Sequence, residues 1–90
     1  MEPKLRKRFT ICNEKGLHAR AATQFVKVAS TFRSEVTVFR NAAVANGKSV
    51  MSLLILAAPR GSQIEIETSG EDAGEALTAL GQLVELGFGE

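Results

Sequence analysis

The stretch QIEIET, at residues 63–68, alternates polar and apolar side chains without interruption. In a strand, this alternation puts Ile64 and Ile66 on one face and Glu65 and Glu67 on the other. A strand with one polar face is typical of an antiparallel sheet that is covered on one side, since a strand covered on both sides is apolar throughout. The chain is therefore expected to leave one face of its sheet in water.

Three further stretches are typical of strands. Residues 5–12 alternate through the apolar pair Phe9 and Ile11. Residues 35–40 read EVTVFR, with two β-branched valines on one side, and residues 43–45 are predicted to return as a short partner strand. The residues expected on the open face of the sheet are Arg8, Thr10, Thr37, Phe39, Glu65 and Glu67.

Three stretches have the spacing of amphipathic helices. The first is residues 19–32, whose apolar residues recur at intervals of three and four. The second follows Ser49, and the PRG sequence at 59–61 should end it. The third begins near Asp72 and stops near Gly87. The residues expected on the three apolar stripes are Ala22, Phe25, Val26 and Ala29, then Val50, Leu53 and Leu54, then Ala73, Ala76, Leu77, Leu80, Leu83 and Val84.

The predicted order of elements is therefore β-α-β-β-α-β-α. Strands with one polar face, interleaved with helices that each carry one apolar stripe, indicate the α+β class. We predict an open-faced β-sandwich in which three helices cover one face of a four-stranded antiparallel sheet. At 90 residues, without repeats or a linker, the chain is expected to form a single domain over residues 1–90.

Composition excludes several classes of protein. A single cysteine, Cys12, excludes an internal disulfide and leaves too few thiols for a zinc cluster. The longest apolar run, residues 53–58, is far shorter than the roughly 20 residues of a membrane-spanning helix. The basic start MEPKLRKRF lacks the apolar segment of an export signal. We therefore expect a cytoplasmic protein without metal, cofactor or membrane insertion.

The basic residues are concentrated near the start of the chain, at Lys4, Arg6, Lys7 and Arg8. The net charge is only +1, and acidic residues are spread through the rest of the sequence. We interpret the basic segment as a solvated strand face and not as a nucleic-acid site.

The only histidine, His18, lies in GLHARAAT, at the predicted start of the first helix. Unpaired N–H groups and the positive end of the helix dipole favour a neutral ring there and attract anions. A neutral ring nitrogen has the lone pair needed to attack phosphorus. The phosphate formed would meet the N–H groups of Ala19 and Arg20 and the guanidinium group of Arg20. The pattern therefore favours a phosphoryl acceptor.

Three other roles compete for His18. Metal binding needs three or four converging ligands, and no carboxylate has the spacing to join His18 on the same helix face. A catalytic triad needs a nucleophile and a deep cleft, for which a domain this small has little room. A surface or capping histidine without a chemical role stays open, because the pattern H-x-R alone is weak.

Three blocks, GLHARAAT at 16–23, GKSVMSLL at 47–54 and QIEIETSGEDA at 63–73, resemble the family of histidine-containing phosphocarrier proteins, HPr, of the bacterial phosphotransferase system. The resemblance covers residues 9–86 and implies four antiparallel strands, three helices and a cytoplasmic relay protein that is a carrier and not an enzyme. It implies that His18 takes a phosphoryl group from phosphorylated enzyme I and passes it to a downstream acceptor domain. Arg20 corresponds to an arginine that supports the transfer. We expect such a carrier to be a monomer.

The resemblance also matches Ser49 to a regulatory serine that a dedicated kinase phosphorylates in some bacteria. A hydroxyl at a helix start is a good N-cap, and a phosphate there would add about two negative charges and could change docking. The alternative is that Ser49 serves only as a cap. Val50, Met51 and Leu54 match an apolar docking patch, in which flexible Met51 suits several partners, and we include Thr23 in the predicted docking surface.

Two positions depart from the family pattern. Ala21 occupies the place of a proline, which would fix φ and withhold an N–H group, whereas alanine keeps the helix and adds a donor. The substitution therefore affects the fine geometry and stiffness of the site. Ser52 stands where glycine is common. The neighbouring Leu53 and Leu56 are expected in the core.

Two other functions within the same family stay open, and a third, from another class, is disfavoured. The chain could be a regulatory protein that acts by phosphorylation-dependent docking, or a carrier of a nitrogen-related branch, which NGKSVMSLLILAAPRG and VELGFGE resemble. An RNA-binding or small-ligand sandwich would use the open sheet face. That face has no Tyr or Trp for stacking, and Glu65 and Glu67 would repel phosphate.

Overall fold

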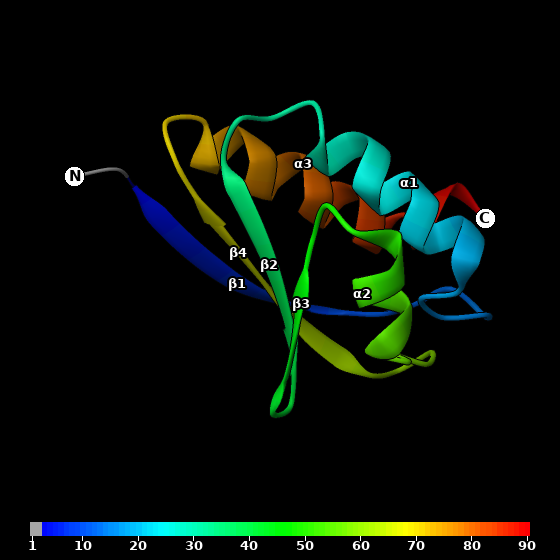
Figure 1. Ribbon diagram of the computed structural model, residues 1–90. Helices are drawn as coiled ribbons and strands as arrows, with labels where there is room; N and C mark the ends of the chain where they lie inside the picture. Colours follow the sequence, from blue (N-terminus) through cyan, green and yellow to red (C-terminus); the bar gives the residue numbers. More distant parts are fainter. Residues whose placement is uncertain (1–2) are drawn as a thin grey trace.

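The computed structural model describes residues 3–90; residues 1 and 2, which belong to the predicted domain, lie outside the described residues. The order of elements along the described chain is the predicted one (Figure 1). The elements are β1 (Lys4–Thr10), α1 (Ala19–Ala29), β2 (Glu35–Arg40), β3 (Ala43–Asn46), α2 (Val50–Ile55), β4 (Gln63–Ser69), α3 (Ala73–Glu85) and a short 3-10 turn, η1 (Gly87–Gly89).

The four strands form one sheet in the order β1-β4-β2-β3, and every neighbouring pair is antiparallel. β1 pairs with β4 along its full length, from Lys4 opposite Ser69 to Thr10 opposite Gln63. The helices lie on one side of this sheet (Figure 1). The predicted open-faced sandwich is therefore confirmed.

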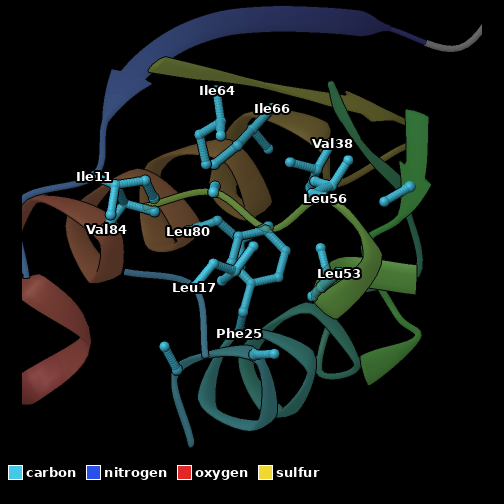
Figure 2. Close-up of a cluster of buried hydrophobic side chains, with 14 of the residues drawn as sticks. Ile11, Leu17, Phe25, Val38, Leu53, Leu56, Ile64, Ile66, Leu80 and Val84 are labelled. Atoms are coloured by element: carbon cyan, nitrogen blue, oxygen red, sulfur yellow. The ribbon is translucent and has the colours of Figure 1, made fainter. Parts of the chain in front are cut away.

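The core lies between the helices and the covered sheet face. Ile64 and Ile66 of β4 are buried there with Phe25 of α1, Leu80 of α3 and Leu53 of α2 (Figure 2). Each such side chain contributes about 1.5 to 3 kcal/mol through burial. Part of the predicted apolar stripes lies at the margin instead, because these residues are partly buried and pack against the core: Val26, Val50, Leu54, Leu77 and Leu83.

Three elements end two or more residues before the predicted boundary. α1 ends at Ala29 and not at residue 32, because Thr31 and Phe32 bond to carbonyls three residues back and close a tight turn. α2 ends at Ile55, since Ala57 takes a positive φ of 50° ahead of the PRG sequence. β1 ends at Thr10, two residues early.

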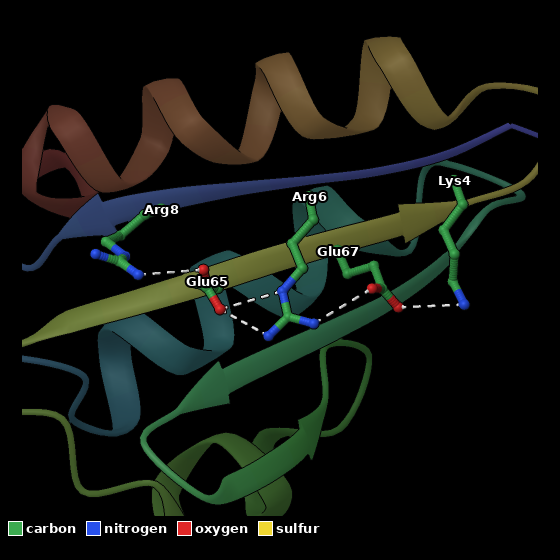
Figure 3. A network of polar contacts seen from close by, with 5 residues as sticks. All are labelled: Lys4, Arg6, Arg8, Glu65 and Glu67. Carbon is green, nitrogen blue, oxygen red and sulfur yellow. Dashed lines mark hydrogen bonds and ion pairs between the residues drawn. The ribbon is translucent and has the colours of Figure 1, made fainter.

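The open sheet face carries an ionic network, which Figure 3 shows along β1 and β4. Arg6 donates to Glu65 at 2.6 and 3.1 Å and also pairs with Glu67 at 3.7 Å. Lys4 pairs with Glu67 at 3.8 Å, and Arg8 with Glu65 at 3.6 Å. The predicted solvated strand face is therefore observed for Lys4, Arg6 and Arg8, which pair with the carboxylates of β4. Lys7 was predicted on the same face but lies on the other side of β1, because side chains alternate along a strand and Lys7 shares the side of Phe9, whose ring its ammonium group contacts.

Asp72 lies at the start of α3, as predicted, but its carboxylate accepts hydrogen bonds from the N–H groups of Arg33 and Ser34, both at 2.9 Å. The Ser34 hydroxyl and these N–H groups hold the pKa of Asp72 below its ordinary value of 3.8. The contact therefore stabilises the fold above that pH, and its contribution should be lost as the pH falls through the lowered pKa. In urea unfolding at pH 2 to 6, the free energy of unfolding of Asp72→Asn should depend less on pH than that of wild type. An unchanged pH dependence in the variant would contradict the role of Asp72.

Two glycines of α3 provide a matched test of core packing. A Cβ atom on Gly81 would lie 2.6 Å from two ring atoms of the buried Phe9, whereas one on Gly74 would have 3.9 Å to its nearest neighbour. Gly81→Ala should therefore destabilise the protein by about 1 to 2 kcal/mol, since the ring must shift. Gly74→Ala should stabilise it by about 0.5 to 1 kcal/mol through helix propensity. Urea unfolding checks both, and equal shifts would contradict the packing.

Candidate functional site

The loop before α1 is held by contacts from both sides. Gly16 adopts a positive φ of 65°, and its carbonyl accepts from the Asn13 side chain at 2.8 Å and from the His18 N–H at 2.9 Å. The buried Leu17 donates its N–H to the carbonyl of Ala58 at 2.9 Å. These bonds fix the point at which the chain enters α1.

His18 is the N-cap residue of α1, as the sequence indicated. Its backbone is extended, and its ring Nδ1 accepts the N–H of Arg20 at 3.3 Å. Its Nε2 lies in short contact with the carboxylate of Glu90. Because Nδ1 accepts a hydrogen bond, it holds the lone pair, and Nε2 carries the proton that points to Glu90. His18 therefore caps α1 through an unprotonated Nδ1.

A surface hollow at this end of the molecule brings basic groups together. Its lining includes His18 and Arg20 from the start of α1, Lys15 from the preceding loop and Arg60 from the loop between α2 and β4. Arg20 is exposed, so its guanidinium group is accessible to a bound anion. The structure thus brings the two predicted site residues together and adds two cations.

The segment at 87–90 closes one side of the hollow; in Figure 1 it lies beside the start of α1. Glu90 accepts from Asn13 at 3.2 Å as well as contacting His18. Partial burial opposes ionisation of Glu90, but the bonds from Asn13 and His18 and the charge of Lys15 outweigh it and lower its pKa. Glu90 therefore stays a carboxylate at neutral pH.

Sequence reasoning missed Asn13, Lys15, Arg60 and Glu90 as parts of the site. Arg60 was interpreted only as part of a helix stop, and Glu90 is 72 residues from His18 along the chain. Neither position carries a local pattern that would link it to the histidine. Ala21, the departure from the family pattern, lies in α1 with its side chain fully buried.

Ser49 is the N-cap of α2, which confirms that part of the prediction. Its hydroxyl accepts the N–H of Ser52 at 3.2 Å, and the residue is half-buried. Ser49 does not line the hollow that contains His18.

The predicted docking residues differ in exposure. Met51 is 69% exposed, Thr23 is exposed on α1, and Val50 and Leu54 are half-buried against the core. Ile55, which sequence reasoning did not single out, is 78% exposed. It lies four residues after Met51 and hence on the same face of α2. Leu53 and Leu56 are buried, as predicted.

Comparison with known proteins gives a consistent result. A family model described as the PTS HPr component phosphorylation site matches residues 5–85. The chain belongs to the HPr family. It is 49% identical to the phosphocarrier protein HPr of Neisseria meningitidis serogroup B, over 96% of this chain and 97% of that protein. It is 42% identical to the phosphocarrier protein NPr of Shewanella violacea, over 97% of this chain and 96% of that protein.

Solved structures agree with this membership. The crystal structure of HPr-C-His from Thermoanaerobacter tengcongensis superposes with a TM-score of 0.92 at 37% identity, covering 96% of this chain and 97% of that one. The resemblance to the HPr family is therefore confirmed, and the chain is a phosphocarrier protein of the phosphotransferase system. Among residues 3–90, no helix has both the length and the apolar character to cross a membrane.

Proposed function

We propose that His18 is the residue that carries the phosphoryl group, taking it from phosphorylated enzyme I and passing it to a downstream acceptor domain. Residues 1–90 act in this proposal as one monomeric domain in the cytoplasm. The observation that carries the proposal is the orientation of the imidazole ring. Nδ1 accepts the N–H of Arg20, so its lone pair points toward the N-terminal end of α1. Family membership supports the relay role.

The proposed step is a displacement at phosphorus. The Nδ1 lone pair forms an N–P bond while the bond between phosphorus and the donor's leaving atom breaks, and that electron pair stays on the donor. The negative oxygens then meet the N–H groups of Ala19 and Arg20 and the guanidinium group of Arg20. The reverse displacement, by an acceptor's nucleophile, restores the free imidazole.

Partners are proposed to dock on the surface of Thr23, Val50, Met51 and Leu54. The exposed Met51 on α2 and the exposed Thr23 on α1 support this placement, because His18 caps the start of α1 and α2 packs on α1. Large exposed apolar side chains at such a position are typical of protein interaction sites. Docking there would bring a donor's phosphoryl group to the helix start.

Ser49 is proposed as a regulatory site that a serine kinase phosphorylates and a phosphorylase reverses. Its position at the N-cap of α2, one residue before Val50, supports the proposal. A phosphate there would place about two negative charges beside the docking surface without removing the helix. A kinase assay tests this: phosphate should appear on Ser49 and slow transfer from enzyme I, and a kinase that labels Ser52 equally would overturn it.

The transfer assay tests the main proposal. The protein is incubated with enzyme I and phosphoenolpyruvate, and the label is expected to be acid-labile, base-stable and located on His18 by mass spectrometry. An unlabelled protein, or a label on any other residue, would overturn the proposal. The labelled protein is then offered to carbohydrate-branch and nitrogen-branch acceptors. Similarity to a phosphocarrier named NPr keeps the second branch as the alternative, and the faster acceptor decides between them.

A further inference from the structure

We infer that Glu90 is a positioning residue for His18, whose carboxylate holds the Nε2–H and balances the charge that the ring gains when Nδ1 takes a phosphoryl group. The inference rests on the proposed function of His18. It concerns a residue that no local sequence pattern links to the histidine.

Both ring nitrogens of His18 are engaged, and each by a different kind of partner. Nδ1 accepts the N–H of Arg20 at 3.3 Å, while Nε2 contacts the Glu90 carboxylate. One neutral form of the ring satisfies both contacts, the form protonated at Nε2. Glu90 and Arg20 together therefore keep the nucleophilic lone pair on Nδ1 and fix the orientation of the ring.

Glu90 is itself held in place. Its other carboxylate oxygen accepts from the amide of Asn13 at 3.2 Å, and Asn13 is buried and also bonded to the Gly16 carbonyl. The Glu90 side chain is 21% exposed and that of His18 is 27% exposed, so water screens their contact only in part. The carboxylate is thus fixed and charged where the ring requires it.

This arrangement matters most when the N–P bond forms. The ring then carries a phosphoryl group on Nδ1 and still carries the proton on Nε2, so it becomes positively charged. A carboxylate at Nε2 stabilises that charge, as an acidic residue does for a protonated catalytic histidine. The proton stays on the ring, hydrogen-bonded to Glu90. On donation, the protonated ring leaves as neutral imidazole, which makes it the better leaving group.

Other charged or titratable groups line the hollow and are the same in wild type and in Glu90→Gln. They come from the loop before α1, from α1, from the loop after α2 and from the end of α3: Cys12, Glu14, Lys15, Arg20, Arg60 and Glu85. Of the two other carboxylates, Glu14 is exposed, and the ring nitrogens of His18 bond to Glu90 and to the Arg20 N–H instead. Glu14→Gln is therefore the matched control, since it removes the same charge from the same hollow.

The experiment compares wild type, Glu90→Gln and Glu14→Gln in two measurements. The first is the rate of transfer from phosphorylated enzyme I, which should fall about tenfold in Glu90→Gln when a charged hydrogen-bond acceptor becomes neutral. The second is hydrolysis of the isolated phosphoprotein against pH. The N–P bond breaks faster when Nε2 is protonated, so the pH of half-maximal hydrolysis should fall by about one unit in Glu90→Gln. Glu14→Gln should match wild type in both.

The outcomes separate the two proposals. A wild type that takes no label on His18 overturns the proposed function, and the inference with it. A labelled wild type whose hydrolysis profile is unchanged in Glu90→Gln, or is shifted equally in Glu14→Gln, overturns the inference alone. The inference is supported if transfer slows and the pH of half-maximal hydrolysis falls in Glu90→Gln but not in Glu14→Gln. A purely structural role of Glu90 would leave the hydrolysis profile unchanged.

Discussion

Replacement of His18 by alanine is expected to abolish the acid-labile phosphate that enzyme I and phosphoenolpyruvate place on the protein. His18 is the only histidine, so no other imidazole can take over its role. The loss should be complete within detection and not merely a slower rate, because the variant lacks the atom that forms the N–P bond. Autoradiography after gel electrophoresis at neutral pH, with and without acid treatment, measures the result.

The controls for this experiment come from the same hollow. Gln24→Ala removes a neutral side chain that also lines it and should keep wild-type labelling. Arg20→Ala should remain labelled at a rate about 10 to 100 times lower, since it loses phosphate stabilisation and not the nucleophile. His18→Ala also loses the cap of α1, worth about 1 kcal/mol, so urea unfolding must show that it is folded. Undiminished labelling of His18→Ala would contradict the assignment.

Gly16→Ala is expected to lower the free energy of unfolding by about 2 to 5 kcal/mol. Two causes add: the positive φ of 65° costs an alanine about 1 to 2 kcal/mol, and overpacking adds about 1 to 3 kcal/mol. The overpacking arises because a Cβ atom would lie 2.5 Å from the Ala58 carbonyl oxygen and 2.9 Å from the Cα atom of Pro59. Neither atom belongs to a side chain that could swing away.

Gly61→Ala is the matched control, because Gly61 has a φ of 88° but no atom within 4 Å of the added carbon. It should cost only the backbone term, about 1 to 2 kcal/mol. Urea unfolding of both variants measures the difference, and equal losses would show that the loop has room at Gly16. Because the Gly16 carbonyl also binds Asn13 and the His18 N–H, Gly16→Ala should in addition slow phosphoryl transfer, whereas Gly61→Ala should not.

Most of the fold could be predicted because each element carries its own pattern. The alternation of β4 and the apolar stripe of α1 are local features, and they place Ile64, Ile66 and Phe25 in the core. The residues at which the helices end were less predictable. α1 and α2 end early because tight turns and a positive φ at Ala57 compete with residues that could continue a helix.

The candidate site, too, contains residues that a local pattern predicts and residues that only the folded chain brings together. His18 and Arg20 are two residues apart and lie at a helix start, so their combination of nucleophile and anion-binding groups is visible in the sequence. Ser49 is visible for the same reason, as a hydroxyl before a helix. The exposure of Met51 and Ile55 could not be predicted from the sequence. Every position of VMSLLI except one is apolar, and only packing decides which side chains face water.

By itself, the sequence determined the strands, the helices, the fold class and the histidine at the start of α1, because these depend on patterns within one or two turns of chain. Only the tertiary structure decided what surrounds that histidine. Asn13, Arg60 and Glu90 come from three separate segments and line one hollow with His18, and Glu90 contacts the ring because the last residues return to the start of α1. The physical reason is that hydrogen bonds and charges act over a few ångströms in space, however far apart in sequence their groups lie.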